Sequence, residues 1–196
     1  MKNWLKYMVI VLVVLIVGGI IYWWVTNNRS VESGVPVNFS LIDRSNYGLY
    51  SDALEEDSQV YKDISVVVVD NDADWKRFWE SSIRNIGTGG FDSLPAVDWN
   101  ANVVLAILQG VKPTGGYYLS TESVVTMSNG LLINMKIVEP AETDGLSQAI
   151  SSPYEVISVP RVEAIGLKGA KIRVVNVSDG AVVFEKPYQD LVYHTN

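Results

Sequence analysis

The fold is decided by residues 103–138, which read VVLAILQGVKPTGGYYLSTESVVTMSNGLLINMKIV. The segment 103–108 is apolar at every position, and such a run predicts a strand that is buried on both faces. Residues 117–127 and 131–138 then predict two further strands, with a tight turn between them. The centre of the chain is therefore expected to form a buried strand followed by a β-hairpin.

The turn of this hairpin is predicted at Asn129-Gly130. This dipeptide favours a two-residue type I′ turn, because both central residues of that turn need a positive φ. With such a turn, Val124 would lie opposite Met135, and one face of the hairpin would be mainly apolar.

Working outward, apolar and β-branched residues predict further strands at 39–42, 64–69 and 154–159. Asp179-Gly180 marks a second hairpin at about 171–186, which would pair Val177 with Val182 on an apolar face. Together these segments give at least seven strands and one clear helix. The expected fold class is a β-rich α+β domain. It would be a curved antiparallel or mixed sheet, or a small barrel, with one helix packed against it.

The helix is expected after the acidic segment DNDAD at 70–74, and Asp72 or Asp74 would cap it. Trp75, Phe78 and Trp79 recur at helical spacing, so we expect Trp79 to be buried and to share its face with one of the other two rings. The alternative interpretation of these acids is a calcium loop. An EF-hand needs Gly at its sixth place and Glu at its twelfth, which this segment lacks, so the acids favour capping.

Residues 7–25 (YMVIVLVVLIVGGIIYWWV) contain no charged side chain, and a helix of this length spans about 30 Å of hydrocarbon. A core helix would show a polar stripe, and a cleaved signal peptide has a shorter apolar run that ends at small residues. We therefore expect an uncleaved membrane anchor. Lys2 and Lys6 precede the run and only Arg29 follows closely, which favours a cytoplasmic N-terminus and an extracytoplasmic domain.

Composition excludes several chemistries. The chain of 196 residues has no cysteine and one histidine, His194, so thiolate metal sites and multi-histidine centres are excluded. After residue 30 the sequence holds 12 basic and 22 acidic residues. An acidic domain without basic clusters argues against nucleic-acid binding. No cofactor and no metal ion are expected.

The segment GVKPTGGY at 110–117 superficially resembles a phosphate loop, but it lacks the Gly-Lys-Ser/Thr signature and a strand follows it. We therefore expect no nucleotide there. One interpretation is a plain turn, with φ fixed by proline and positive φ at the glycines. The other is a recognition loop whose adjacent tyrosines supply contact area, with one ring inward and the other available. The two are compatible, and the predicted binding residues are Lys112, Pro113, Thr114, Gly115, Gly116, Tyr117 and Tyr118.

A further possibility is acid-dependent hydrolysis. Glu139, Glu142 and Asp144 cluster around Pro140, and Asp98 lies earlier in the chain. Two carboxylates at the right separation could act as general acid and base. Acidic loops on an acidic domain are usually only solvated, so catalysis is the weaker interpretation. Whether residues 139–144 bind an ion stays open.

Several short motifs occur in a recognisable order: SNYGL at 45–49, Asp74-Trp75 with Phe78-Trp79, LPAVDW at 94–99, GVKPTGGY at 110–117, and SPYEVISVP at 152–160. From about residue 39 to 160 the chain resembles the C-terminal domain of the PrcB family, which is named for a subunit of a bacterial surface protease complex. The segments LPAVDW and GVKPTGGY are the specific parts of this resemblance. The anchor and the hairpin at 171–186 lie outside it.

The resemblance implies an exported, non-enzymatic domain that associates with a protease or another extracytoplasmic protein. The expected organisation is an anchor at 1–28, a linker at 29–38 and an extracytoplasmic domain at 39–196 in a single-pass membrane protein. The expected function is therefore a membrane-anchored accessory or binding domain. The alternatives are a hydrolase that uses Asp98, Glu139 and Glu142, and an envelope protein that binds wall polymer through exposed aromatic rings.

Overall fold

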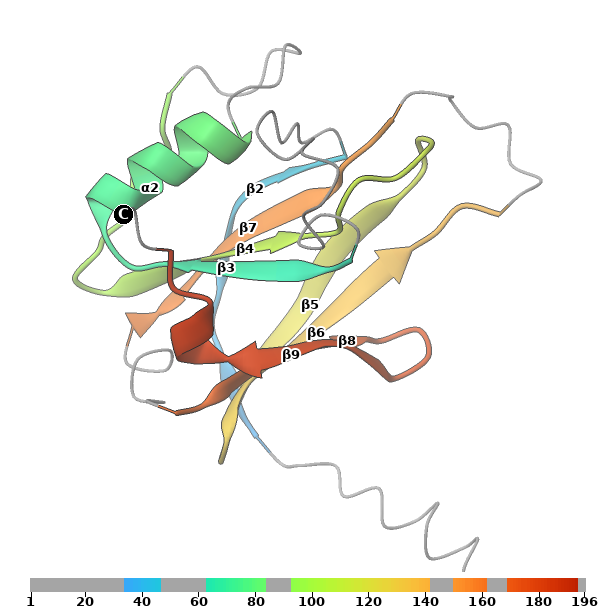
Figure 1. Ribbon diagram of the computed structural model, residues 1–196. Coiled ribbons are helices and arrows are strands. Elements are labelled where there is room, and N and C mark those ends of the chain that lie inside the picture. Colours follow the sequence, from blue (N-terminus) through green and yellow to red (C-terminus); the bar gives the residue numbers. More distant parts are fainter. Residues whose placement is uncertain (1–33, 47–62, 84–92, 142–149, 162–168, 194–196) are drawn as a thin grey trace, which may run out of the picture. The chain divides into compact units, whose positions relative to one another are not determined.

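A computed structural model describes residues 34–46, 63–83, 93–141, 150–161 and 169–193 (Figure 1). The chain divides into two units, Met1–Ser33 and Gly34–Asn196, and all described residues belong to the second. The predicted anchor and residues 29–33 of the predicted linker lie outside the described residues. Within the described ranges, no helix is long and apolar enough to cross a membrane.

The described residues form two sheets. The first has five strands in the order β1-β5-β6-β8-β9, and the second has four in the order β2-β7-β4-β3. Neighbouring strands are antiparallel except β6 and β8, which are parallel. The first sheet comprises β1 (Val35–Val37), β5 (Tyr118–Met127), β6 (Gly130–Val138), β8 (Lys171–Asn176) and β9 (Ala181–Pro187). The second comprises β2 (Ser40–Ser45), β7 (Tyr154–Pro160), β4 (Asn102–Leu108) and β3 (Ser65–Val69).

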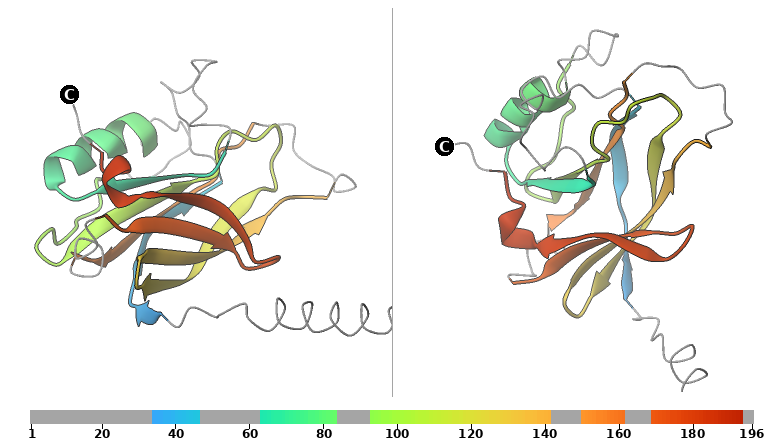
Figure 2. Two further views of the ribbon diagram at one scale, coloured as in Figure 1. Left: turned by 60° about the horizontal axis from the view of Figure 1, so that its bottom comes forward. Right: turned by 45° about the vertical axis from the view of Figure 1, so that its right-hand side comes forward.

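The sheets and the helix form three layers, which Figures 1 and 2 show from several sides. Strand β4 lies in the middle layer and is buried on both faces, as predicted. Val103, Leu105 and Ile107 point into the core between the two sheets. The alternate residues of β4, such as Val104, point into a second core beneath the helix. The period of two along a strand thus divides one apolar run between two cores.

The β-rich α+β class and the single packed helix are confirmed, but the single curved sheet and the small barrel are not. Both sheets are open within the described residues. Two sheets form because β4 and β7 each have two apolar faces, and the short helix covers only one of them. Val35–Val37, in the stretch expected to be a linker, is strand β1 and pairs with β5.

The helix α2 spans Asp72–Phe78 and continues as one π-helical stretch, Trp79–Ile83. Its N-cap is Asn71, not Asp72 or Asp74, because the Asn71 side chain accepts a hydrogen bond of 2.9 Å from the backbone N–H of Asp74. Trp79 is only 2% exposed and its ring centroid lies 5.1 Å from that of Trp75. The predicted aromatic face is confirmed.

The hairpin between β5 and β6 forms, but its register differs from the prediction by two residues. Val124 lies opposite Ile133, not Met135, and the turn residues are Ser128 and Asn129. No non-glycine residue in the described part of the chain has a positive φ, so the turn is not of type I′. Gly130 is needed for another reason: a Cβ there would lie 1.9 Å from the carbonyl oxygen of Lys171 on the neighbouring strand β8.

The second hairpin, β8–β9, also differs in register. Val174 pairs with Phe184 and Val175 with Val182, because the pairing shifts between Val174 and Val175. Val174 and Phe184 are buried, whereas Val182 is 54% exposed. The shift changes which residues face the core, and the predicted pair of Val177 with Val182 is wrong.

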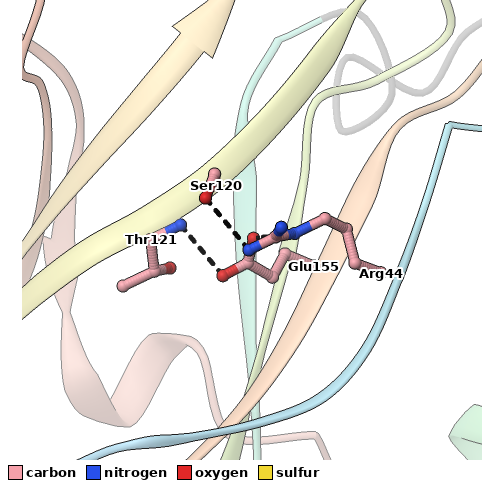
Figure 3. A network of polar contacts seen from close by, with 4 residues as sticks. All are labelled: Arg44, Ser120, Thr121 and Glu155. Carbon is pink, nitrogen blue, oxygen red and sulfur yellow. Dashed lines mark hydrogen bonds and ion pairs between the residues drawn. The ribbon is translucent and has the colours of Figure 1, made fainter.

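A buried carboxylate connects the two sheets (Figure 3). Glu155 on β7 accepts a hydrogen bond of 2.7 Å from Arg44 Nε on the edge strand β2 and one of 2.9 Å from the backbone N–H of Thr121 on β5. Arg44 also donates to Ser120 Oγ over 3.0 Å. The register of β5 against β6 shifts between Thr121 and Ser123, and such a bulge interrupts the ladder at this point.

The end of the described chain closes the side of the second sheet. After the short 3-10 helix Tyr188–Asp190, the backbone N–H of Val68 donates to Leu191 and that of Tyr193 donates to Val68, each over 2.8 Å. Burial, with a smaller effect from the charge of Asp70, raises the pKa of Tyr188 to about 12, and Arg161 opposes this rise.

Candidate functional site

The predicted recognition loop lies between the end of β4 and the start of β5. Two positive φ values shape it, at Gly110 (80°) and Gly116 (88°), whereas Gly115 has none. Pro113 and Gly116 are exposed, Gly115 is buried, and the other predicted residues of the loop are half-buried. The loop thus offers two exposed positions between flanks that are held by the domain.

The loop is fixed to residue 151, just before β7. Lys112 and Ser151 exchange backbone hydrogen bonds of 2.7 Å and 3.0 Å. The hydroxyl of Ser151 also donates to the carbonyl of Thr114 over 2.6 Å. These contacts attach the segment GVKPTGGY to the residue that directly precedes SPYEVISVP, although the two motifs are separate in the sequence.

Neither tyrosine of the loop is buried. Tyr117 precedes β5 and Tyr118 is its first residue, and both are half-buried. The expected division into one inward and one outward ring is therefore not seen, because the alternation of a strand does not extend to Tyr117. The Nζ of Lys112 lies 5.6 Å from the centre of the Tyr117 ring, within the range of a cation–π contact.

Lys112 also lines a cavity of about 560 Å³ at one end of the space between the sheets. Figure 1 shows the start of β3, the end of β6 and the β8–β9 turn together on the right-hand side. Ile64, Ile137 and Val183 form the apolar part of the cavity wall and pack against the core between the sheets. A volume of this size is within the usual range of ligand sites.

The wall of the cavity contains a buried amide without a hydrogen-bond partner. Gln109 follows β4 directly and is only 1% exposed. Neither its side-chain nitrogen nor its side-chain oxygen has a partner. Its backbone N–H, by contrast, donates to the carbonyl of Pro153 over 2.8 Å. An unpaired buried polar group costs about 1–3 kcal/mol, and native proteins contain few of them.

The cavity is lined by more acids than bases. Among the described residues, its charged lining comprises the three acids Asp63, Glu139 and Asp179, all exposed, and the base Lys112. Asn176 adds a second amide. The arrangement combines an aliphatic surface, an amide able to donate and to accept, and a negative rim.

Sequence reasoning identified Lys112 but missed Gln109. The available signal was a polar residue that directly continues the apolar run of β4. Its burial depends on β6 and β9, which lie far away in the sequence, so the run alone could not show it.

Of the acids proposed for hydrolysis, the two that the structure describes, Asp98 and Glu139, are not brought together. The carbonyl of Asp98 accepts from the backbone N–H of Asn102, the first residue of β4, over 2.9 Å. Glu139 lines the cavity beside Gln109, at the opposite end of β4. Seven residues of strand separate the two ends, roughly 20 Å. Glu142 and Asp144 lie outside the described residues. Among the residues described, no three acids or histidines are placed to hold a metal ion.

The described unit is thus a two-sheet β-rich domain with an ordered loop and a cavity at one end of its central strands. Residues 103–160 match the family model described as PrcB C-terminal. This match confirms the resemblance for the segment from β4 to β7, which includes the loop, Gln109 and Glu139. Searches of curated proteins and of solved structures found no match to the chain.

The match is shorter than the resemblance drawn from the motifs, which begins near residue 39. The family segment supplies Gln109, Lys112, Ile137 and Glu139 to the cavity. The remaining wall comes from the start of β3 and from the β8–β9 hairpin, which lie outside the match.

Proposed function

We propose that the chain is an accessory domain that binds another extracytoplasmic protein, such as a subunit of a surface protease complex. The match of residues 103–160 to the PrcB C-terminal family supports a role related to a protease complex. The observation that carries the proposal is the position of the family segment's loop: exposed at Pro113 and Gly116, fixed at Ser151, and adjoining the cavity through Lys112.

The loop suits protein recognition because it is already ordered. A loop held by three hydrogen bonds to Ser151 loses little conformational freedom when a partner binds. The half-buried Tyr117 and Tyr118 add aromatic area beside the exposed positions.

The proposal includes membrane attachment through residues 7–25, with the domain outside the cytoplasm. It rests on the uncharged apolar run and on the basic residues that precede it. The absence of cysteine allows a clean test, since a single introduced thiol has no competitor. Val182→Cys should react with a membrane-impermeant maleimide in intact cells, and Lys2→Cys only after lysis. Labelling of both, or of neither, in intact cells would contradict this topology.

The domain is proposed to have no catalytic activity of its own. The separation of Asp98 from Glu139 along β4 supports this proposal, because these two carboxylates do not form a pair. Replacement of Asp98 by Asn should therefore leave any activity of the partner complex unchanged.

The binding function is tested by photo-crosslinking in cells that produce the full chain. A benzophenone amino acid is placed at Pro113 on the loop or, as a matched exposed control, at Glu80 on the helical segment. We expect an adduct with one extracytoplasmic protein from position 113 and not from position 80. Equal adducts from both positions would refute the proposed surface, and an adduct with polysaccharide would favour the wall-polymer alternative.

A further inference from the structure

The cavity combines a buried unpaired amide with a negatively charged rim. Its wall contains the unpaired side-chain amide of Gln109, which is only 1% exposed, and its rim carries the carboxylates of Asp63, Glu139 and Asp179. Solvated acids alone would indicate nothing. A buried amide that lacks a partner for both of its polar atoms, in the wall of a cavity, calls for an explanation, and a bound ligand is one.

The geometry points to a peptide-binding site: we infer that this cavity receives an extended segment of the partner protein that carries one aliphatic side chain flanked by lysine or arginine. The inference rests on the proposed binding function and names the chemistry of the partner's segment. Each part of the occupant follows from a different part of the wall.

The aliphatic side chain is required by Ile64, Ile137 and Val183, which give the cavity an apolar surface that continues the core between the sheets. Removing such surface from water stabilises a complex through the hydrophobic effect. A volume of about 560 Å³ is larger than one side chain needs, so there is also room for the adjoining backbone.

A peptide backbone is favoured by Gln109. A carboxamide has both a carbonyl acceptor and N–H donors, and an extended peptide offers an N–H and a C=O in return. Both side-chain polar atoms of Gln109 are buried in the free protein, so the side chain must turn towards the cavity for one peptide group to satisfy them. A purely apolar ligand would leave them unpaired.

Cationic flanking residues are favoured by charge. Three acids and one base of the described part of the chain line the cavity, and the whole chain has a formal net charge of −7. Lys112 lies over the ring of Tyr117, at the side of the loop. A basic segment gains attraction and a faster encounter at such a rim, whereas an acidic segment is repelled.

The test uses the full chain in detergent micelles, labelled with ¹⁵N, and three blocked pentapeptides: GKLKG, GKGKG and GELEG. We expect GKLKG to shift the side-chain amide resonances of Gln109 in a saturable way. GKGKG lacks the aliphatic group and GELEG reverses the charge, so both should bind at least about tenfold more weakly. Absence of saturable shifts with GKLKG, or equal shifts with all three, would overturn the inference.

Two variants separate the parts of the site, with binding followed at the backbone amide of Lys112. Gln109→Leu should weaken the binding of GKLKG about tenfold, because the amide that pairs with the peptide is lost. The denaturation midpoint should rise, because an unpaired buried amide is removed. The double variant Asp63→Asn with Glu139→Gln should weaken the binding of GKLKG about fivefold. The control, Glu80→Gln with Glu122→Gln, makes the same change in charge at exposed residues outside the cavity wall and should leave binding unchanged.

These outcomes are distinct from those of the crosslinking experiment. If position 113 captures a partner but Gln109→Leu binds GKLKG as well as the wild type, the binding function stands and the cavity inference falls. If GKLKG binds through Gln109 but position 113 captures no protein, the cavity is a peptide site and the proposed protein surface is refuted.

Discussion

Two buried polar side chains on neighbouring strands differ in how they are satisfied. Glu155 on β7 and Gln109 at the end of β4 are 0% and 1% exposed. Glu155 accepts hydrogen bonds from Arg44 and from the backbone of Thr121, whereas the side chain of Gln109 has no partner. The comparison teaches that a buried polar side chain can have different roles in one domain. Glu155 connects the two sheets, whereas Gln109 stays unpaired in the wall of the cavity.

The largest expected effect comes from removing the partner of the satisfied group. Arg44→Met leaves the carboxylate of Glu155 buried without its cation, and this should lower the free energy of unfolding by about 3 kcal/mol. Urea denaturation measures the loss. The double variant Arg44→Met with Glu155→Leu should recover much of it, because no charge stays buried. A loss below about 0.5 kcal/mol, the range of ordinary surface changes, would break the comparison.

The opposite sign is expected for the unpaired group. Gln109→Leu keeps an apolar stem of similar size and removes two unsatisfied atoms, so the free energy of unfolding should rise by about 1–2 kcal/mol. The same denaturation experiment measures it. A decrease in stability would show that the amide has a structural partner, and would refute the contrast with Glu155.

Tyr188 gives a second comparison with Gln109. Its hydroxyl is also buried without a partner, but the residue does not line the cavity. Burial raises the pKa of Tyr188 to about 12, well above the ordinary value for a tyrosine, so the neutral phenol is favoured in the folded state. Its contribution to stability is full below pH 10 and is lost as the pH rises from 10 towards 12.

Tyr188→Phe should abolish this part of the alkaline loss and leave peptide binding unchanged. Urea midpoints of the wild type and the variant at pH 9 and pH 11.5 measure the difference. Identical pH dependence in the two proteins would show that the Tyr188 phenol does not contribute.

The smallest effect is expected at Glu185, an exposed carboxylate on β9. Hydrogen bonds from Lys171 and Arg173 lower the pKa of Glu185. A lowered pKa gives stability that is present above the usual carboxyl range and is lost as the pH falls through the folded value. Glu185→Gln should change the thermal midpoint at pH 7 only slightly, and 1 M salt should remove the difference. A large change in the thermal midpoint that does not depend on salt would mean that exposed ion pairs also stabilise this domain.

The elements that the sequence predicted best are those whose apolar pattern is visible within their own residues. Residues 103–108 are apolar throughout and form a strand buried on both faces, and Trp75, Phe78 and Trp79 share a helical face. Burial of this kind follows from the period of the side chains alone.

Two features of the β5–β6 hairpin could not be predicted because they depend on distant contacts. The shift at Thr121 coincides with the carboxylate of Glu155, which binds the Thr121 backbone from the other sheet. Gly130 is required by Lys171 on the parallel strand β8, not by the turn. Neither constraint is visible in the hairpin's own residues.

The candidate site was predicted in part. Lys112 was identified from its loop, but the cavity that it lines also needs β3, β6 and β9. Gln109 was not predicted as a binding residue, because glutamine is usually exposed and only the three-dimensional packing buries this one.

The most direct test of the account measures stability and binding on the same Gln109→Leu sample. The account predicts opposite changes: a higher midpoint in urea and about tenfold weaker binding of the GKLKG peptide, since the unpaired amide is costly alone and satisfied by a ligand. If stability falls together with binding, or if both stay unchanged, Gln109 is an ordinary structural residue and the central claim is contradicted.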